Sequence, residues 1–188
     1  MRRPCDAGQC GGVAGTGPDE TLSVSVVVPS IGRTVLADVV AQALAQGALE
    51  VVVVADTNPE KVKGVLAGAG LLADCRLRVL EGSGRGAGPA RQVGVEAVTG
   101  DVVLLLDDDV VPGPGLVAGH ERVHRTGPGL VVVGYMPVAK ELVERRVAAT
   151  IYSDDYEGEC RVLDADPTRV LYQLWAGNIS MRRQVPPG

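Results

Sequence analysis

GDVVLLLDDDVVP, residues 100–112, sets a run of five apolar residues directly before three consecutive aspartates. A run this short and this apolar is typical of a strand that is buried on both faces, as in a parallel sheet covered by helices. We therefore expect a strand over residues 101–106. The acids Asp107, Asp108 and Asp109 then follow its carboxyl end.

Strands of the same kind recur on both sides of this stretch, and helical patterns separate them. We expect strands at residues 22–28, 51–54, 76–80, 101–106 and 130–136, and helices at 34–47, from Asn58, from Pro89 to Gly100 and from about Pro114. Regular alternation of strands and helices predicts βαβ units. The expected fold class is α/β, with a mostly parallel, Rossmann-like sheet flanked by helices in a single domain.

The composition agrees with this architecture and limits the function. The chain has 188 residues, which suits one domain, and 46% of them are hydrophobic although only 3% are aromatic. The formal net charge is −5, and the basic residues are scattered along the chain. Because no basic stripe is present, nucleic acid is not an expected partner.

The expected cellular location follows from the segments that the sequence lacks. No apolar run reaches the roughly 20 residues that a transmembrane helix needs, and no signal peptide is readable. The four cysteines, Cys5, Cys10, Cys75 and Cys160, form no CxxC pair and are expected to be reduced thiols. We therefore expect a cytoplasmic protein, with peripheral association with a membrane left open. Residues 1–21 are rich in glycine without hydrophobic periodicity, which predicts a flexible tail.

The residues that directly follow each strand are the candidates for a ligand site, because open α/β sheets bind ligands at the carboxyl ends of their strands. Three adjacent carboxylates repel one another unless a cation lies among them. Carboxylate oxygens suit Mg²⁺ or Mn²⁺, which complete their shells with phosphate oxygens and water. A solvated acidic turn is the alternative interpretation of the run. The candidates are Pro29, Ser30 and Arg33, then Asp56, residues 82–88, and Asp107–Asp109.

Four segments carry a family resemblance. They are SVVVPSIGR (25–33), VVVVADTNP (51–59), GRGAGPARQVGVEAVTGDVVLLLDDDVVP (84–112) and LWAGNISMRR (174–183). In this order they resemble the successive motifs of family 2 glycosyltransferases with the GT-A fold. The resemblance extends from about Leu22 to Arg183. It implies a GT-A fold and a glycosyltransferase that takes its sugar from a nucleotide-linked donor.

The same resemblance implies roles for individual residues of the donor site. Asp107 and Asp109 match the two acids of the DxD motif. Asp107 would approach the ribose and the metal, and Asp109 would bind the metal directly, as Mn²⁺ or Mg²⁺. Asp108 fills the variable position and receives no role. Pro29, Ser30 and Arg33 would line the nucleotide pocket, Asp56 would contact the base or ribose, and Gly88 and Arg91 belong to the loop and helix start at the nucleotide.

Residues 22–136 would thus bind the nucleotide sugar, and residues 137–188 would form a partial acceptor side. There the resemblance implies roles for Trp175, Gly177 and Asn178. Core packing of the indole ring and capping of a turn by the amide are the alternatives. The donor would be a UDP-, GDP- or dTDP-linked sugar, and the sequence does not indicate the acceptor.

Inverting members of this family use a carboxylate base that usually lies beyond the segment matched by GNISMRR. The chain ends at Gly188, so the resemblance assigns no catalytic base within it. Asp154, Asp155, Glu157 and Glu159 are expected in a solvated acidic loop. The expected function is an inverting, metal-dependent glycosyltransferase. The alternatives are an enzyme completed by a partner, and a truncated or non-catalytic module for nucleotide-sugar binding or protein interaction.

Other patterns point less strongly to other functions. His120-Glu121-Arg122-Val123-His124 has the HExxH spacing of zinc proteases. Arg122 stands where such enzymes need an uncharged residue, and a solvent-facing histidine pair is the simpler interpretation. A nucleotidyltransferase would carry a glycine-rich phosphate loop after its first strand, where VVVPSIGR has a single glycine. The run GSGRGAG follows the third strand, which argues against a dinucleotide site.

Overall fold

The computed structural model describes residues 21–172 and 175–183. Apart from Thr21, the predicted tail lies outside them, as do Cys5 and Cys10. The strands are β1 (Val24–Ser30), β2 (Glu50–Ala55), β3 (Leu77–Glu81), β4 (Val102–Leu106), β5 (Val131–Val133) and β6 (Asn178–Arg182). The helices are α1 (Leu36–Ala45), α2 (Pro59–Gly68), α3 (Ala87–Ala97), α4 (Leu116–Arg125), α5 (Lys140–Val143) and α6 (Val147–Ala165), with 3-10 turns η1 (Leu71–Ala73) and η2 (Pro167–Tyr172).

The strands form one six-stranded sheet in the order β3-β2-β1-β4-β6-β5. β1 pairs in parallel with β2 and with β4, and β2 pairs in parallel with β3. β6 is antiparallel to both of its neighbours, so the other strands share one direction. The predicted α/β class with a mostly parallel sheet in a single domain is confirmed.

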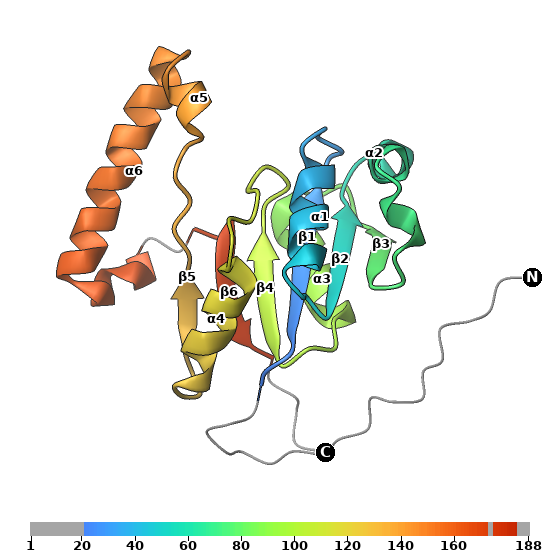
Figure 1. Ribbon diagram of the computed structural model, residues 1–188, viewed down its shortest axis with the longest axis horizontal. Helices are drawn as coiled ribbons and strands as arrows, with labels where there is room; N and C mark the ends of the chain where they lie inside the picture. Colours follow the sequence, from blue (N-terminus) through green and yellow to red (C-terminus); the bar gives the residue numbers. More distant parts are fainter. Residues whose placement is uncertain (1–20, 173–174, 184–188) are drawn as a thin grey trace, which may run out of the picture.

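Helices cover both faces of the sheet. Figure 1 shows α1 and α4 in front of the sheet and α3 behind it. Side chains alternate between the faces, as a strand requires. Val26 and Val28 of β1 pack with α1 and α2, whereas Val27 packs with Ala90 of α3. Every residue of β1, β2 and β4 is buried, which explains why their sequences consist mainly of apolar residues.

The approach of α3 to β1 depends on Gly94. A Cβ atom at this position would collide with Cγ1 of Val27. Glycine therefore allows the helix to lie directly on the strand. This close packing fixes the first turn of α3 against the carboxyl ends of β1 and β2, where the candidate site lies.

The structure differs from the predictions in the C-terminal third. The predicted strand at residues 130–136 is limited to Val131–Val133, and the N–H of Gly134 makes a further bond to the carbonyl oxygen of Asn178 at 2.8 Å. The backbone N–H of Met136 donates instead to the Tyr156 hydroxyl at 2.6 Å. The segment NISMR, for which no strand was predicted, forms β6 and enters the sheet between β4 and β5.

The prediction of a solvated loop for Asp154, Asp155, Glu157 and Glu159 is also wrong, because these residues belong to the helix α6. This helix stands at the edge of the molecule, beside the segment that joins β5 to α5 (Figure 1). Tyr156 is its buried residue, while Asp154 and Asp155 are exposed. Within residues 21–172 and 175–183, no helix is both long and apolar enough to span a membrane. Cys75 and Cys160 are free thiols.

Candidate nucleotide and metal site

A cavity of about 250 Å³ lies beyond the carboxyl ends of β1, β2 and β4. Open α/β sheets bind their ligands at this edge. The charged residues in its lining are two arginines and three aspartates, which come from the segments after β1, β2 and β4 and from the start of α3. The lining consists of Pro29, Ser30, Ile31, Arg33, Asp56, Gly86, Ala87, Arg91, Asp107 and Asp108.

Asp107 connects the cavity to the turn that precedes β6. Its Oδ1 accepts a short hydrogen bond from Nη2 of Arg91. Its backbone N–H donates to the carbonyl oxygen of Gly177 at 3.0 Å. The Nε–H of Arg91 is buried without a partner among the described residues. A buried donor of this kind favours a ligand that brings an acceptor.

Asp108 is buried, with a relative exposure of 3%. Its Oδ2 accepts hydrogen bonds from Ser30 Oγ at 2.7 Å and from the backbone N–H of Ile31 at 3.2 Å. Its Oδ1 accepts from Nη1 of Arg33 at 2.7 Å, and the same nitrogen donates to Oδ2 of Asp109 at 2.7 Å. The carboxylate therefore joins β1, the turn that follows it, and the acidic run after β4.

Asp56 forms the side of the cavity at the end of β2. Its backbone N–H donates to the carbonyl oxygen of Ser30 at 2.9 Å, and its Oδ2 accepts from the backbone N–H of Gly86 at 2.9 Å. Its Oδ1 is buried and has no partner among the described residues. This oxygen is an acceptor that a hydroxyl or N–H of a ligand would satisfy.

The cavity brings together most of the donor-site residues predicted from the sequence. Gly88 is exposed in the first turn of α3 and does not line the cavity, whereas Gly86 and Ala87 do. The helix begins at Ala87, two residues before the predicted start at Pro89. Asp109 lies at the rim, with a side chain that is 51% exposed. The predicted donor-site residues that do line the cavity are Pro29, Ser30, Arg33, Asp56, Arg91 and Asp107.

Asp108 was among the candidates after the fourth strand but received no role, although the strand pattern contains a signal for one. Alternate residues of β4 point to one face, where Leu104 and Leu106 pack with α1. Asp108 continues this alternation, and Ser30 does the same beyond Val28 of β1. Extending the period of two beyond both strands places the two polar side chains together.

Asp107 and Asp109 are the candidate metal ligands. Among the described residues, no group of three or more His, Cys, Asp and Glu side chains is arranged to hold a metal ion by itself. Both carboxylates are partly exposed, at 37% for Asp107 and 51% for Asp109. Mg²⁺ and Mn²⁺ accept one or two carboxylates when substrate phosphates complete the shell. The donor set therefore fits a cation that enters together with a diphosphate.

His120 and His124 are buried between α4 and β6, so the prediction of a solvent-facing pair is wrong. His120 contacts Asn178 Oδ1 through Nε2 at 2.9 Å and Ser180 Oγ through Nδ1 at 2.7 Å. His124 Nε2 also contacts Ser180 Oγ, at 2.7 Å. Burial lowers the pKa of both rings. Three of the four ring nitrogens thus bond protein groups, which argues against the zinc-protease alternative.

Trp175 does not line the cavity but packs against Tyr156, with ring centroids 4.6 Å apart. Tyr156 in turn lies 5.8 Å from Tyr135, and burial raises the pKa of its hydroxyl. Gly177 and Asn178 lie beside the cavity and not in its lining. Nδ2 of Asn178 donates to the carbonyl oxygen of Tyr135 at 3.4 Å. An acceptor-binding role for these residues stays a prediction.

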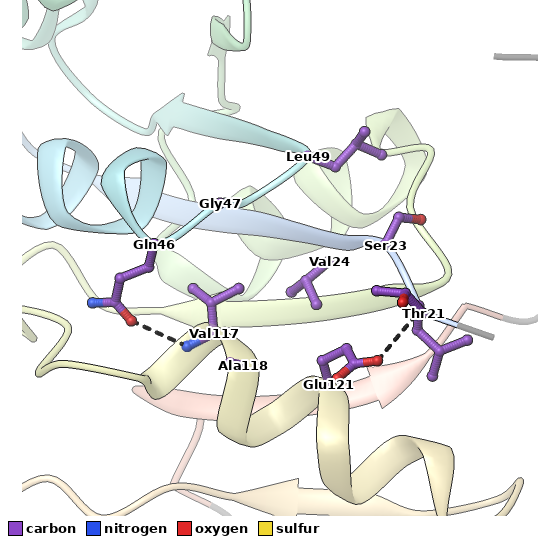
Figure 2. A pocket seen from close by; sticks show the side chains of 10 residues that line it. Thr21, Ser23, Val24, Gln46, Gly47, Leu49, Val117, Ala118 and Glu121 are labelled. Carbon is purple, nitrogen blue, oxygen red and sulfur yellow. Dashed lines mark hydrogen bonds between the residues drawn. The ribbon is translucent and has the colours of Figure 1, made fainter. Parts of the chain in front are cut away.

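A second cavity, of about 350 Å³, lies at the opposite edge of the sheet, near the start of β1. Figure 2 shows that its polar side chains bond to the protein itself. Gln46 Oε1 accepts from the backbone N–H of Val117 at 3.3 Å, and Glu121 Oε1 accepts from the N–H of Leu22 at 3.1 Å. These groups hold α1, α4 and β1 together, so we interpret this hollow as part of the scaffold.

The sequence profile of glycosyl transferase family 2 matches residues 25–183. This match covers most of the chain, and the protein therefore belongs to glycosyl transferase family 2. No curated protein sequence matches the chain at a significant level.

Solved structures share the fold at low sequence identity. The chain has a TM-score of 0.54 and 18% identity with glucosyl-3-phosphoglycerate synthase from Mycobacterium tuberculosis in complex with phosphoglyceric acid, covering 86% of this chain and 57% of that one. For the mannosyltransferase PcManGT from Pyrobaculum calidifontis in complex with GDP-Man and Mn²⁺, the TM-score is 0.51 and the identity 21%, covering 63% and 36%. The fold is therefore GT-A. The match spans 57% of the length of the synthase and 36% of that of the mannosyltransferase.

Proposed function

We propose that this domain binds a nucleotide diphosphate sugar together with Mn²⁺ or Mg²⁺ and serves a glycosyltransferase reaction. Membership of glycosyl transferase family 2 supports the transferase class. The observation that carries the proposal is the cavity at the carboxyl edge of the sheet, where Arg33 and Arg91 contact three consecutive aspartates.

The charges at this cavity support a requirement for a cation. Four carboxylates, those of Asp56 and Asp107–Asp109, lie at the cavity or its rim with the guanidinium groups of Arg33 and Arg91 and the ammonium group of Lys61, which donates to the carbonyl oxygen of Ile31 at 3.3 Å. These groups sum to a formal charge of −1. An anionic diphosphate is repelled by such a site unless a divalent cation enters with it. When bound, that cation supplies Lewis-acid stabilisation of the departing diphosphate. Asp107 and Asp109 are the residues that would hold it.

Other residues of the cavity have the chemistry that a nucleotide needs. The unpartnered Oδ1 of Asp56 is suited to accept a hydrogen bond from a ribose hydroxyl or a base N–H. The unpartnered Nε–H of Arg91 is suited to donate to a phosphate oxygen, as is the guanidinium of Arg33. The first backbone N–H groups of α3, from Ala87 and Gly88, add a helix N-terminus that favours anions.

The acceptor would enter beside Asp107 at the turn that contains Gly177, with Trp175 and Asn178 on either side of that glycine in the sequence. Transfer would proceed with inversion, by direct attack of an acceptor hydroxyl on the anomeric carbon of the sugar. We assign no catalytic base. A donor-binding module without transfer is the alternative function, and it shares the nucleotide and metal site with the enzyme.

Calorimetric titration with UDP, GDP and dTDP, each with and without Mn²⁺, tests the proposal. We expect one nucleotide to bind, and to bind more tightly with Mn²⁺. Thermodynamic reciprocity requires that nucleotide to strengthen Mn²⁺ binding by the same factor. Absence of Mn²⁺-dependent binding with all three nucleotides would overturn the assignment. Transfer from the matching nucleotide sugar then separates an enzyme from a binding module.

A further inference from the structure

Asp108 differs from the two acids that flank it, because it is buried while they are partly exposed. Building on the proposed function, we propose that Asp108 is a positioning residue that holds Arg33 in place to receive the diphosphate of the donor. It would act through Arg33 and through the turn after β1, without contacting the ligand itself.

The two oxygens of Asp108 have separate tasks. Oδ2 accepts from Ser30 Oγ and from the N–H of Ile31, which orders the turn after β1. Ser30 Oγ accepts in turn from the N–H of Gly32, whose φ of +76° suits glycine. Oδ1 accepts only from Arg33 among the described residues. One carboxylate thus orders the backbone of the turn and the side chain that projects from it.

Arg33 needs such an anchor because its side chain is 48% exposed. A half-exposed arginine samples many rotamers in water, and their loss on binding weakens affinity. Its other contact is Asp109, which under the proposed function turns to the cation. The side chain of Asp108 is only 5% exposed and is held by its hydrogen bonds to Ser30 and Ile31. It therefore keeps Arg33 beside the phosphates when Asp109 changes partner.

The substitution Asp108→Asn isolates this anchor. An asparagine oxygen placed at the position of Oδ2 still accepts from Ser30 and Ile31, and its NH₂ group then faces Nη1 of Arg33, where two donors cannot bond. Charge alone predicts the opposite effect on binding. Removing one carboxylate from a site of net negative formal charge reduces its repulsion of a diphosphate and should tighten binding.

The chain offers a matched control at the other end of the same strand pair. Asp101 accepts from Ser23 Oγ at 2.6 Å and from the N–H of Ser23 at 2.9 Å, before the start of β4. Asp101→Asn therefore makes the same chemical change at a carboxylate with similar partners, at the edge of the sheet away from the cavity.

The experiment measures affinity for whichever of UDP, GDP and dTDP binds the wild-type protein, at a Mn²⁺ concentration beyond which affinity no longer rises. We expect Asp108→Asn to weaken this affinity by about threefold to tenfold, and Asp101→Asn to leave it unchanged. In an Arg33→Gln background, Asp108→Asn should have an effect below about twofold, because the group that it positions is gone. Circular dichroism checks that each variant is folded.

The outcomes separate this inference from the proposed function. Wild-type protein that binds none of the nucleotides with Mn²⁺ overturns both. If the wild-type protein binds a nucleotide and Asp108→Asn binds it equally or more tightly, only the positioning role is overturned. The same conclusion follows if Asp108→Asn weakens binding as strongly in the Arg33→Gln variant as in the wild-type protein. The positioning role is supported if Asp108→Asn weakens nucleotide binding in the wild-type protein but not in the Arg33→Gln variant.

Discussion

The backbone N–H of Asp107 donates to the carbonyl oxygen of Gly177 at 3.0 Å, although the two residues lie 70 positions apart. A Cβ atom on Gly177 would lie 3.0 Å from Oδ2 of Asp107 and 3.1 Å from Sδ of Met136. The turn before β6 therefore covers one side of the carboxylate that we propose as a metal ligand, and a larger residue there would require this carboxylate or the Met136 side chain to shift.

We expect Gly177→Ala to weaken Mn²⁺-dependent nucleotide binding by about threefold or more, because a metal ligand tolerates displacements of only about 0.2 Å. Gly113→Ala is the control, since a Cβ atom there meets nothing within 4 Å. Calorimetry with the nucleotide that binds best makes the comparison. Unchanged affinity in Gly177→Ala would show that the turn before β6 does not constrain Asp107.

Asp109 is the carboxylate whose loss should affect the metal most and the fold least, because its side chain is 51% exposed. We expect Asp109→Asn to abolish the dependence of nucleotide binding on Mn²⁺ without lowering the midpoint of thermal unfolding by more than a degree or two. Asp155→Asn removes one exposed acid of α6 and controls for net charge. If Mn²⁺ still strengthens binding in Asp109→Asn, this residue is not a metal ligand.

Gly94 should be the helical glycine most sensitive to substitution, because a Cβ atom there collides with Val27. We expect Gly94→Ala to lower the free energy of unfolding by about 1–3 kcal/mol through overpacking. Gly64→Ala in α2 meets nothing within 4 Å and should raise it by about 0.5–1 kcal/mol, the helix preference of alanine over glycine. Urea unfolding measures both, and equal effects would contradict the close packing of α3 on β1.

Stability should fall between about pH 7.5 and 5.5 because of the buried histidines. Their ordinary pKa is 6.5, and burial lowers it in the folded chain. The unfolded chain then binds more protons in this window, so the free energy of unfolding decreases as pH falls, by at most about 1.4 kcal/mol per histidine per pH unit. Glu50 and Asp101 also have lowered pKa values, but their stabilisation is lost only below their ordinary values of 4.5 and 3.8.

The variant His120→Gln separates the histidine contribution from that of other groups. Glutamine does not titrate, so the variant should be less stable at every pH and show a shallower decrease between pH 7.5 and 5.5. Thermal unfolding at several pH values provides the comparison. A slope equal to that of the wild-type protein would mean that other groups cause the pH dependence.

Much of the structure of residues 22–136 was predictable from sequence. The strands at 24–30, 50–55 and 102–106 are fully buried, and the apolar runs within them have few alternatives to a central parallel strand. Parallel strands bring their carboxyl ends to one edge, so residues that follow them meet there whatever the helices between them do. This is why Ser30, Asp56 and Asp107 share one cavity, as their positions in the sequence indicated.

The C-terminal third was less predictable because its elements depend on partners. NISMR has a single strongly apolar residue, Ile179, on the α3 face, while Asn178 and Ser180 point to the histidines of α4. Its polar residues therefore gave no strand signal, yet Asn178 and Ser180 are hydrogen-bonded to the histidines once α4 covers them. The acids of α6 were mistaken for a loop because charge density does not by itself distinguish a solvated loop from the exposed face of a helix.

Sequence alone determined the α/β class, the edge of the sheet that holds the candidate site, and most of the residues around its cavity, because these follow from local hydrophobic patterns and strand polarity. Tertiary structure decided which charges pair. Arg33 meets Asp108 across 75 residues, Arg91 meets Asp107 across 16, and His120 meets Asn178 across 58. Such contacts depend on how separate elements dock, and docking is determined by the packing of whole faces and not by any local pattern.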